Sequence, residues 1–140
     1  MEGLGVVANV IAVVDLSVKV ASLCLQYAKD VRNAAADIER LHEEVTNLRR
    51  ISEDVQSLLK SPNGKRLEKS QNLDDALGRV LVRLTELKER LKPSTTYKAI
   101  SRMGFRALKW PFNRSEVEQL LQEFRRCTQT ISLTLQVDQT

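Results

Sequence analysis

Residues 73–91 read LDDALGRVLVRLTELKERL, and six of their apolar side chains recur at alternating steps of four and three: Leu73, Leu77, Val80, Leu84, Leu87 and Leu91. This spacing places them along one side of an α-helix, whose period is 3.6 residues. Asn72 is the candidate N-cap, and Pro93 ends the helix. Asp74 and Asp75 suit the positive N-terminal end of such a helix. A single apolar stripe must be buried against another element, so we expect further helices.

Two other segments have the same rhythm. Residues 34–60 form one, which ends at the turn Ser61-Pro62-Asn63-Gly64. Its apolar positions are Ile38, Leu41, Val45, Leu48, Ile51, Val55 and Leu58. The last helix is predicted to begin at a capping box that joins Ser115 to Glu118. Its apolar positions are Val117, Leu120, Phe124, Cys127, Ile131 and Leu135.

The composition agrees with a helical domain. The 140 residues are 42% hydrophobic and only 4% aromatic, with five Gly and three Pro, which excludes collagen-like, disordered and disulfide-scaffold classes. A chain of this length buries enough surface to fold without a metal or disulfides. We therefore expect a single all-α domain over residues 1–140, an antiparallel four-helix bundle with an additional short basic helix or loop before the last helix.

The first helix is expected to differ from the others. No charged residue lies between Gly3 and Val14, and the apolar side chains spread over most of the helix circumference. Such a helix is either buried on all sides, wrapped by the other three, or able to enter lipid. We expect its Val and Ile side chains to pack inward at rest. The candidate membrane-inserting residues are Leu4, Val6, Val7, Val10, Ile11 and Val14.

A polar stripe follows on the same helix. The uncharged part is only about 18 Å long, too short for a hydrocarbon core of about 30 Å. Extending it to Tyr27 places Asp15 and Lys19 near the middle, at a cost of about 3 kcal/mol each, which argues against a lone transmembrane helix. Several copies together are expected to turn their polar side chains toward a lumen. The candidate lumen residues are Asn9, Asp15, Lys19, Ser22 and Gln26.

Positive charge is concentrated in one block. Seven of the 22 Lys and Arg residues lie between Glu89 and Glu116, where there is no acid. Three interpretations stay open: a connector whose aromatic side chains plug the end of the bundle, a membrane-binding segment, or a nucleic-acid site, for which no motif is present. Basic and aromatic side chains together suit the headgroup region of a membrane. The candidate lipid-binding residues are Lys98, Arg102, Arg106, Lys109, Trp110 and Phe112.

Residues suited to catalysis are sparse. The single histidine, His42, lies near the polar edge of a regular helix, with no nucleophile motif to serve. Cys24 and Cys127 match no metal or redox spacing, and we expect reduced thiols in the core. We therefore expect no enzyme, no cofactor, no metal and no small-molecule substrate. The start of the chain lacks the basic region of a signal peptide, which favours a cytoplasmic protein.

Five segments together resemble the HeLo-like N-terminal domain of fungal STAND (NLR-type) receptors. They are residues 1–15 (MEGLGVVANVIAVVD), 19–23 (KVASL), 34–41 (AAADIERL), 106–112 (RALKWPF) and 129–133 (QTISL). The necroptosis executioner's four-helix domain and the coiled-coil domains of plant helper receptors are similar in form.

The resemblance implies a helical bundle at the front of a larger receptor. It also implies a function in heterokaryon incompatibility and innate immunity, in which the domain oligomerises, moves from the cytoplasm to the plasma membrane and permeabilises it. The expected partners are anionic membrane lipids and further copies of the chain, and not nucleic acid. The alternative, from a different class, is a soluble adaptor domain that recruits a protein partner by helix-helix contact.

Overall fold

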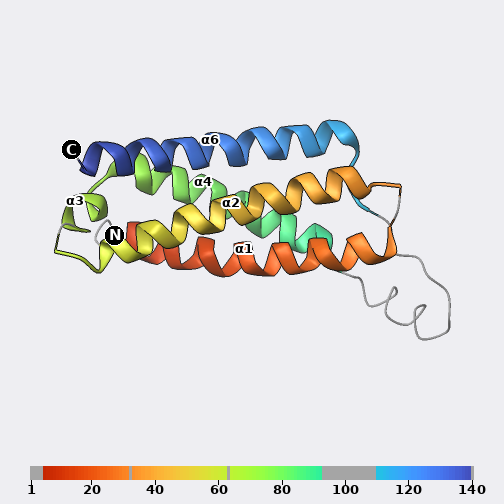
Figure 1. Ribbon diagram of the computed structural model, residues 1–140, viewed down its shortest axis with the longest axis horizontal. Coiled ribbons are helices and arrows are strands. Elements are labelled where there is room, and N and C mark those ends of the chain that lie inside the picture. The colour runs from red at the N-terminus through yellow and green to blue at the C-terminus, as the bar shows by residue number, and fades with distance from the viewer. Residues whose placement is uncertain (1–4, 32, 63, 93–109, 140) are drawn as a thin grey trace.

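A computed structural model describes residues 5–31, 33–62, 64–92 and 110–139 (Figure 1). Over these residues the chain is all-helical, with five helices packed together and no strand. The four long helices are α1 (Gly5–Asp30), α2 (Ala35–Leu59), α4 (Gln71–Leu91) and α6 (Arg114–Gln139), and α3 (Gly64–Glu68) is short. The prediction of an all-α fold is confirmed.

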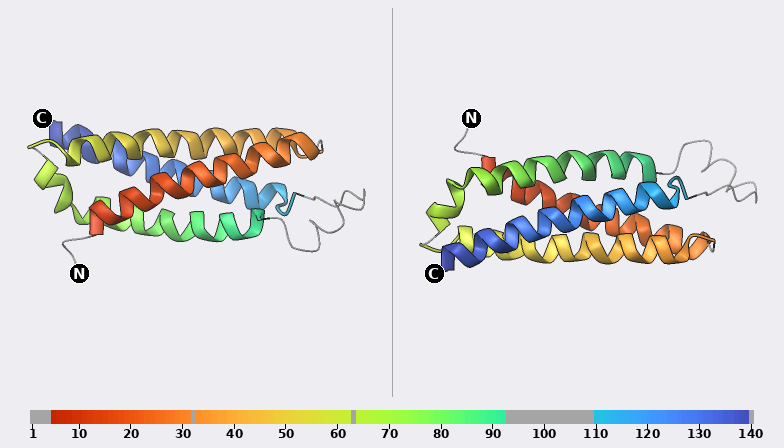
Figure 2. Two further views of the ribbon diagram at one scale, coloured as in Figure 1. Left: turned by 90° about the horizontal axis from the view of Figure 1, so that it is seen from below. Right: turned by 90° about the horizontal axis from the view of Figure 1, so that it is seen from above.

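The long helices lie side by side, and each runs opposite to the one before it (Figure 1). Helices α2 and α4 each pack against both α1 and α6. The two remaining helices, α1 and α6, lie on opposite faces of the molecule (Figure 2). This arrangement is compatible with the predicted four-helix bundle. It does not place α1 at the centre, because α1 packs mainly against two of the three other long helices.

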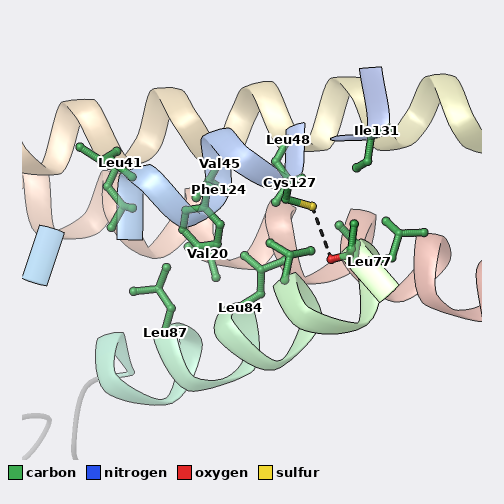
Figure 3. Close-up of a cluster of buried hydrophobic side chains, with 14 of the residues drawn as sticks. Val20, Leu41, Val45, Leu48, Leu77, Leu84, Leu87, Phe124, Cys127 and Ile131 are labelled. Carbon is green, nitrogen blue, oxygen red and sulfur yellow. Dashed lines mark hydrogen bonds between the residues drawn. The ribbon is translucent and has the colours of Figure 1, made fainter. Parts of the chain in front are cut away.

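The core runs along the inner sides of all four long helices. Figure 3 shows Val20 of α1, Leu48 of α2 and Leu84 of α4 gathered around Phe124 of α6. In α4 every predicted apolar position is buried. In α2 and α6 the inward side differs at two places: Ser52 is buried beside a half-buried Ile51, and Leu121 is buried beside a half-buried Leu120. At both places the buried residue lies four positions after the preceding buried residue, where the prediction had three. A helical period of 3.6 residues allows either spacing.

The predicted helix caps need correction. The N-cap of α4 is Ser70, whose hydroxyl accepts a hydrogen bond from the Leu73 amide at 3.2 Å, and not Asn72. At the start of α6, Asn113 Oδ1 accepts from the Glu116 amide at 2.8 Å, and Glu116 Oε1 accepts from the Asn113 amide at 3.1 Å. This reciprocal pair is the capping box, two residues before the predicted one.

Helix α3 was not expected, because the sequence predicts only a turn after α2. In the structure, α3 begins directly after that turn. The Gly64 amide donates to the Ser61 carbonyl oxygen at 3.0 Å, and Leu67 is buried against the core. A Cβ added at Gly64 would lie 2.5 Å from the Leu58 carbonyl oxygen. The close approach of the two backbones therefore requires glycine, which lets α3 close one end of the molecule.

Candidate functional site

Helix α1 presents one side to the core. We define its inner seam as Val6, Val10, Val13, Ser17, Val20, Cys24, Tyr27 and the following Val31, all of which are buried. The inner seam packs against α2 and α4. Two of the candidate insertion residues, Val6 and Val10, belong to it, with 2% and 0% of their surface exposed.

The remaining candidate insertion residues lie elsewhere. Val7 and Val14 are half-buried, and Ile11 is 51% exposed. Leu4 lies outside the described residues. The expectation that all Val and Ile side chains of this helix pack inward is therefore wrong: a helix in contact with two neighbours buries only one side, and the apolar side chains of α1 extend beyond it.

The candidate lumen residues divide into two groups. Ser22 and Gln26 are exposed, as are Asp15 and Lys19, which form an ion pair across one helical turn at 3.0 Å. Asn9 is engaged with the neighbouring helix instead. Its amide nitrogen donates to Asp74 Oδ1 of α4 at 2.9 Å.

The same carboxylate lies against the first turn of α1. A Cβ added at Gly5 would lie 2.5 Å from Asp74 Oδ1. A carboxylate near the N-terminal end of a helix is favoured by the helix dipole. Asp74 therefore fixes the start of α1 to α4 in two ways, through the hydrogen bond from Asn9 and through close contact with Gly5, where a Cβ would displace the carboxylate.

Of the six candidate lipid-binding residues, the structure describes two. Lys98, Arg102, Arg106 and Lys109 lie outside the described residues. Trp110 is half-buried and Phe112 is buried. The Trp110 ring stands edge-on to Tyr27 at 5.4 Å and to Phe112 at 5.3 Å, measured between ring centroids. This aromatic cluster at the end of the core favours the plug interpretation for these two side chains.

Arg90, at the end of α4, holds the aromatic cluster in place. Its guanidinium lies over the Phe112 ring, 4.2 Å from the centroid, and donates to the Pro111 carbonyl oxygen at 2.6 Å. It also donates to Glu116 at 2.9 Å. The pKa of Glu116 lies below its ordinary value because of the Asn113 amide and Arg90. One charge of the basic block is thus neutralised within the protein, and Lys92 pairs with Glu89 at 3.7 Å.

A groove between α4 and α6 was missed by the sequence reasoning. Its volume is about 570 Å³, and one rim carries Arg83, which pairs with Glu86 and Glu123. The residues that line it are Ala76, Arg79, Val80, Val82, Arg83, Glu86, Glu123, Arg126, Cys127 and Thr130. The small side chains Ala76 and Thr130 leave this space, and Val82, which is 58% exposed, was the available signal because it lies off the predicted apolar stripe.

The two cysteines and the histidine lie on three different helices. Cys24 and Cys127 are buried free thiols, and burial raises the pKa of each to about 12. The Cys127 thiol donates to the Ala76 carbonyl oxygen at 3.5 Å (Figure 3). His42 is half-buried on α2. Within the described part of the chain, no group of three or more His, Cys, Asp or Glu residues is placed to hold a metal ion.

The comparisons with known proteins give no relative. No family model matches the chain, and neither does any curated protein or any solved structure.

Proposed function

We propose that this chain is a HeLo-like four-helix bundle that acts as a membrane-targeting, oligomerisation-triggered cell-death effector domain. In the proposed mechanism it rests in the cytoplasm, as part of a fungal NLR-like immune or incompatibility receptor. On activation it assembles with further copies, moves to the plasma membrane and permeabilises it. The sequence segments that resemble the HeLo-like domain support the family assignment.

The observation that carries the membrane activity is the composition and exposure of α1. Residues Gly5–Lys29 are long and apolar enough to cross a membrane, and only 28% of their most apolar stretch is buried inside the protein. A helix of 25 residues measures about 37 Å, more than the hydrocarbon core of about 30 Å. The core helix of a soluble protein and a signal sequence meet the same criterion of length and composition, but a core helix that meets it is mostly buried.

The charged pair on α1 restricts how the helix inserts. Asp15 and Lys19 face away from the core, so they would meet the acyl chains if a single helix crossed alone. In a ring of several copies the same side chains face one another and water, which lowers the cost. The proposed activity therefore requires oligomerisation before insertion.

Anionic lipids are the proposed membrane partner. Since Arg90 and Lys92 are paired with glutamates, the charge for headgroups is assigned to Lys98, Arg102, Arg106 and Lys109. Each basic side chain at an anionic surface contributes around 1 kcal/mol.

The alternative function is a soluble adaptor, and one observation favours it. The groove between α4 and α6 has an apolar floor and a rim of charged side chains, which suits an amphipathic helix of a protein partner. In the adaptor interpretation α1 is a core helix only, and Trp110 and Phe112 stay in the aromatic cluster.

Dye release from liposomes distinguishes the two functions. Ile11→Glu places a charge on the exposed side of α1 and should abolish release from anionic vesicles, with the fold retained. Leu133→Glu is the matched control, because Leu133 lies on α6 and is 61% exposed. Full release by a folded Ile11→Glu chain would refute the insertion of α1, and absence of release by the unmodified chain would favour the adaptor.

A second comparison tests the lipid partner. Replacing Lys98, Arg102, Arg106 and Lys109 together with Glu should abolish sedimentation with anionic vesicles. Raising the salt concentration should weaken binding of the unmodified chain, because exposed charges are screened beyond about 10 Å at 0.1 M. If the unmodified chain bound neutral vesicles as strongly as anionic vesicles, the assignment of these four residues would be contradicted.

A further inference from the structure

Helix α1 carries a second apolar seam beside the buried one. The outer seam consists of Val7, Ile11, Val14, Val18, Ala21, Leu25 and Ala28. Like the inner seam, it advances by alternating steps of four and three. Unlike the inner seam, which includes Ser17, it contains no polar residue. Because the two seams differ by one residue, they lie roughly 100° apart around the helix.

The outer seam is most exposed at three large side chains. Ile11, Val18 and Leu25 follow one another at intervals of seven residues and are 51%, 45% and 52% exposed. Val7, Val14 and Ala21 are half-buried, and Ala28 is exposed. Since α2 and α4 pack against the inner seam, they cover Val7, Val14 and Ala21 only in part, and the other described elements leave the rest of the outer seam exposed.

The spacing indicates what fits this face. A seven-residue repeat keeps apolar side chains in register with a second helix over several turns, as in a left-handed coiled coil. A lipid surface requires apolar area but sets no condition on spacing. The regular repeat therefore favours another helix as the occupant of the outer seam.

The charges beside the seam indicate which helix. Asp15, Ser22 and Lys29 follow Val14, Ala21 and Ala28 by one residue each, so they form a row along one edge of the seam. This row is self-complementary when a second copy runs antiparallel with the twofold axis midway between Val18 and Ala21. Asp15 of one copy then lies about 7.5 Å along the helix axis from the level of Lys29 of the other, so the long Lys29 side chain extends toward it. In a parallel arrangement each of the two residues faces the opposite edge of the partner's seam instead.

The apolar side chains fit the same antiparallel register. In it Val18 of one copy meets Ala21 of the other, Ile11 meets Ala28, and Val14 meets Leu25. Two of these three layers thus combine a large side chain with a small one, which fills the space between the helices evenly. A parallel arrangement places Ala21 on Ala21 and Ala28 on Ala28, which leaves gaps.

We propose that the outer seam of α1 is a self-association surface, through which two copies of this chain pair antiparallel in solution. This inference names an interface for the oligomerisation in the proposed function, but it needs no membrane and no activating signal. The ion pair between Asp15 and Lys19 does not oppose it. That pair is 62% and 51% exposed, so it is weak and can be exchanged for the contact with Lys29.

Sedimentation equilibrium without lipid tests the pairing. The unmodified chain should show a reversible monomer-dimer equilibrium. Val18→Glu should weaken it at least tenfold, because two carboxylates then lie near the twofold axis in an apolar contact. Leu133→Glu, which changes a more exposed apolar residue on another helix, should leave it unchanged. Circular dichroism checks that both variants stay folded, which the exposure of both positions favours.

Charge reversal tests the orientation. Asp15→Lys alone and Lys29→Asp alone should each weaken the dimer, and the double variant should restore it. In a parallel dimer Asp15 and Lys29 face the opposite edge of the partner's seam and not each other, so the single variants would change little. Unchanged dimerisation of both single variants would overturn the antiparallel arrangement.

Cross-linking gives an independent measure of orientation. Mixing Val14→Cys with Leu25→Cys should yield a mixed disulfide, and neither variant should cross-link rapidly to itself. The native thiols are suited to this experiment, because Cys24 and Cys127 are buried and burial raises the pKa of each to about 12. Rapid self-cross-linking of Leu25→Cys would show a parallel pair instead.

The pairing and the proposed function fail separately. A chain that stays monomeric at every concentration yet releases dye would overturn the pairing and leave the membrane function standing. A chain that dimerises as predicted but releases no dye would overturn the membrane function and leave the pairing standing. If the chain is monomeric and Val18→Glu abolishes vesicle binding, lipid is the occupant of the outer seam and the pairing is wrong.

Discussion

Replacing Arg90 with alanine should loosen the end of the molecule at which the aromatic cluster lies. The change removes three contacts at once: the guanidinium over the Phe112 ring, the hydrogen bond to the Pro111 carbonyl oxygen and the ion pair with Glu116. All three fix the segment that leads into α6. Their loss frees Phe112 and Trp110 to leave the core together.

The expected loss of stability follows from the first two contacts. A cation-π contact at an exposed site contributes about 0.5–1 kcal/mol. A hydrogen bond contributes about 0.5–1.5 kcal/mol, and the charge on the guanidinium favours the upper part of this range. Together they give about 2 kcal/mol. For 140 residues the unfolding entropy is about 0.3 kcal/mol/K, so Tm should fall by about 7 °C.

Arg83→Ala is the matched control. Arg83 lies two turns earlier on α4, its side chain is exposed to nearly the same degree as that of Arg90 (45% against 47%), and it pairs with glutamates but with no ring. Exposed ion pairs contribute about 0–1 kcal/mol, so its Tm should fall by less than 3 °C. Thermal unfolding followed by circular dichroism measures both. Trp110 is the only tryptophan, and its emission should shift to the red in Arg90→Ala alone. Equal Tm values for the two variants, with unchanged emission, would refute the role assigned to Arg90.

Three further predictions concern stability. Val10→Glu should unfold the protein, since Val10 is 0% exposed, whereas Ile11→Glu should cost less than about 1 kcal/mol in urea unfolding. Ser17→Ala should raise the free energy of unfolding by about 1 kcal/mol, because the buried Ser17 hydroxyl has no hydrogen-bond partner in the described part of the chain; a decrease would show that the hydroxyl is satisfied. Because the pKa of Glu116 is lowered in the folded chain from an ordinary 4.5, its contribution is complete above pH 4.5 and is lost as the pH falls further. Glu116→Gln should therefore flatten the loss of stability between neutral pH and pH 3, and identical pH profiles would contradict this.

The sequence predicts most of the core of α4, because all six residues of the apolar stripe are buried; Ala76 is buried in addition, and Val82, off the stripe, is exposed. In α2 and α6 the sequence does not decide which of two neighbouring residues is buried, for example Leu120 or Leu121. Both positions border the stripe, and only the packing of the adjacent helix selects one.

The caps show a similar limit. Asn113 and Ser115 are both good N-cap residues, each with a glutamate three positions later. The second glutamate, Glu118, instead forms an ion pair with Arg40 of α2, a contact between residues far apart in the sequence. Tertiary contacts therefore decide which of two local motifs forms.

The candidate site was harder to predict than the fold. A continuous apolar segment such as that in α1 indicates that much of the helix avoids water, but it does not show which side meets the core. The exposure of Ile11 and Val18 emerges only when the neighbours of α1 are known. The groove between α4 and α6 is formed by two segments some 40 residues apart, as are the contacts of Arg83 with Glu123, and no local pattern reports it.

The abundance of valine in α1 has a consequence for its release. Seven of the residues from Gly5 to Asp30 are valines, whose branched side chains lose rotational freedom in a helix. At about 0.5 kcal/mol each relative to alanine, they lower the intrinsic helix stability by about 3–4 kcal/mol. Detached from α2 and α4 in water, this segment would therefore unwind as it leaves. In water, α1 would therefore lose its helical structure at the same time as it separates from α2 and α4. It stays helical only while it packs against another apolar surface.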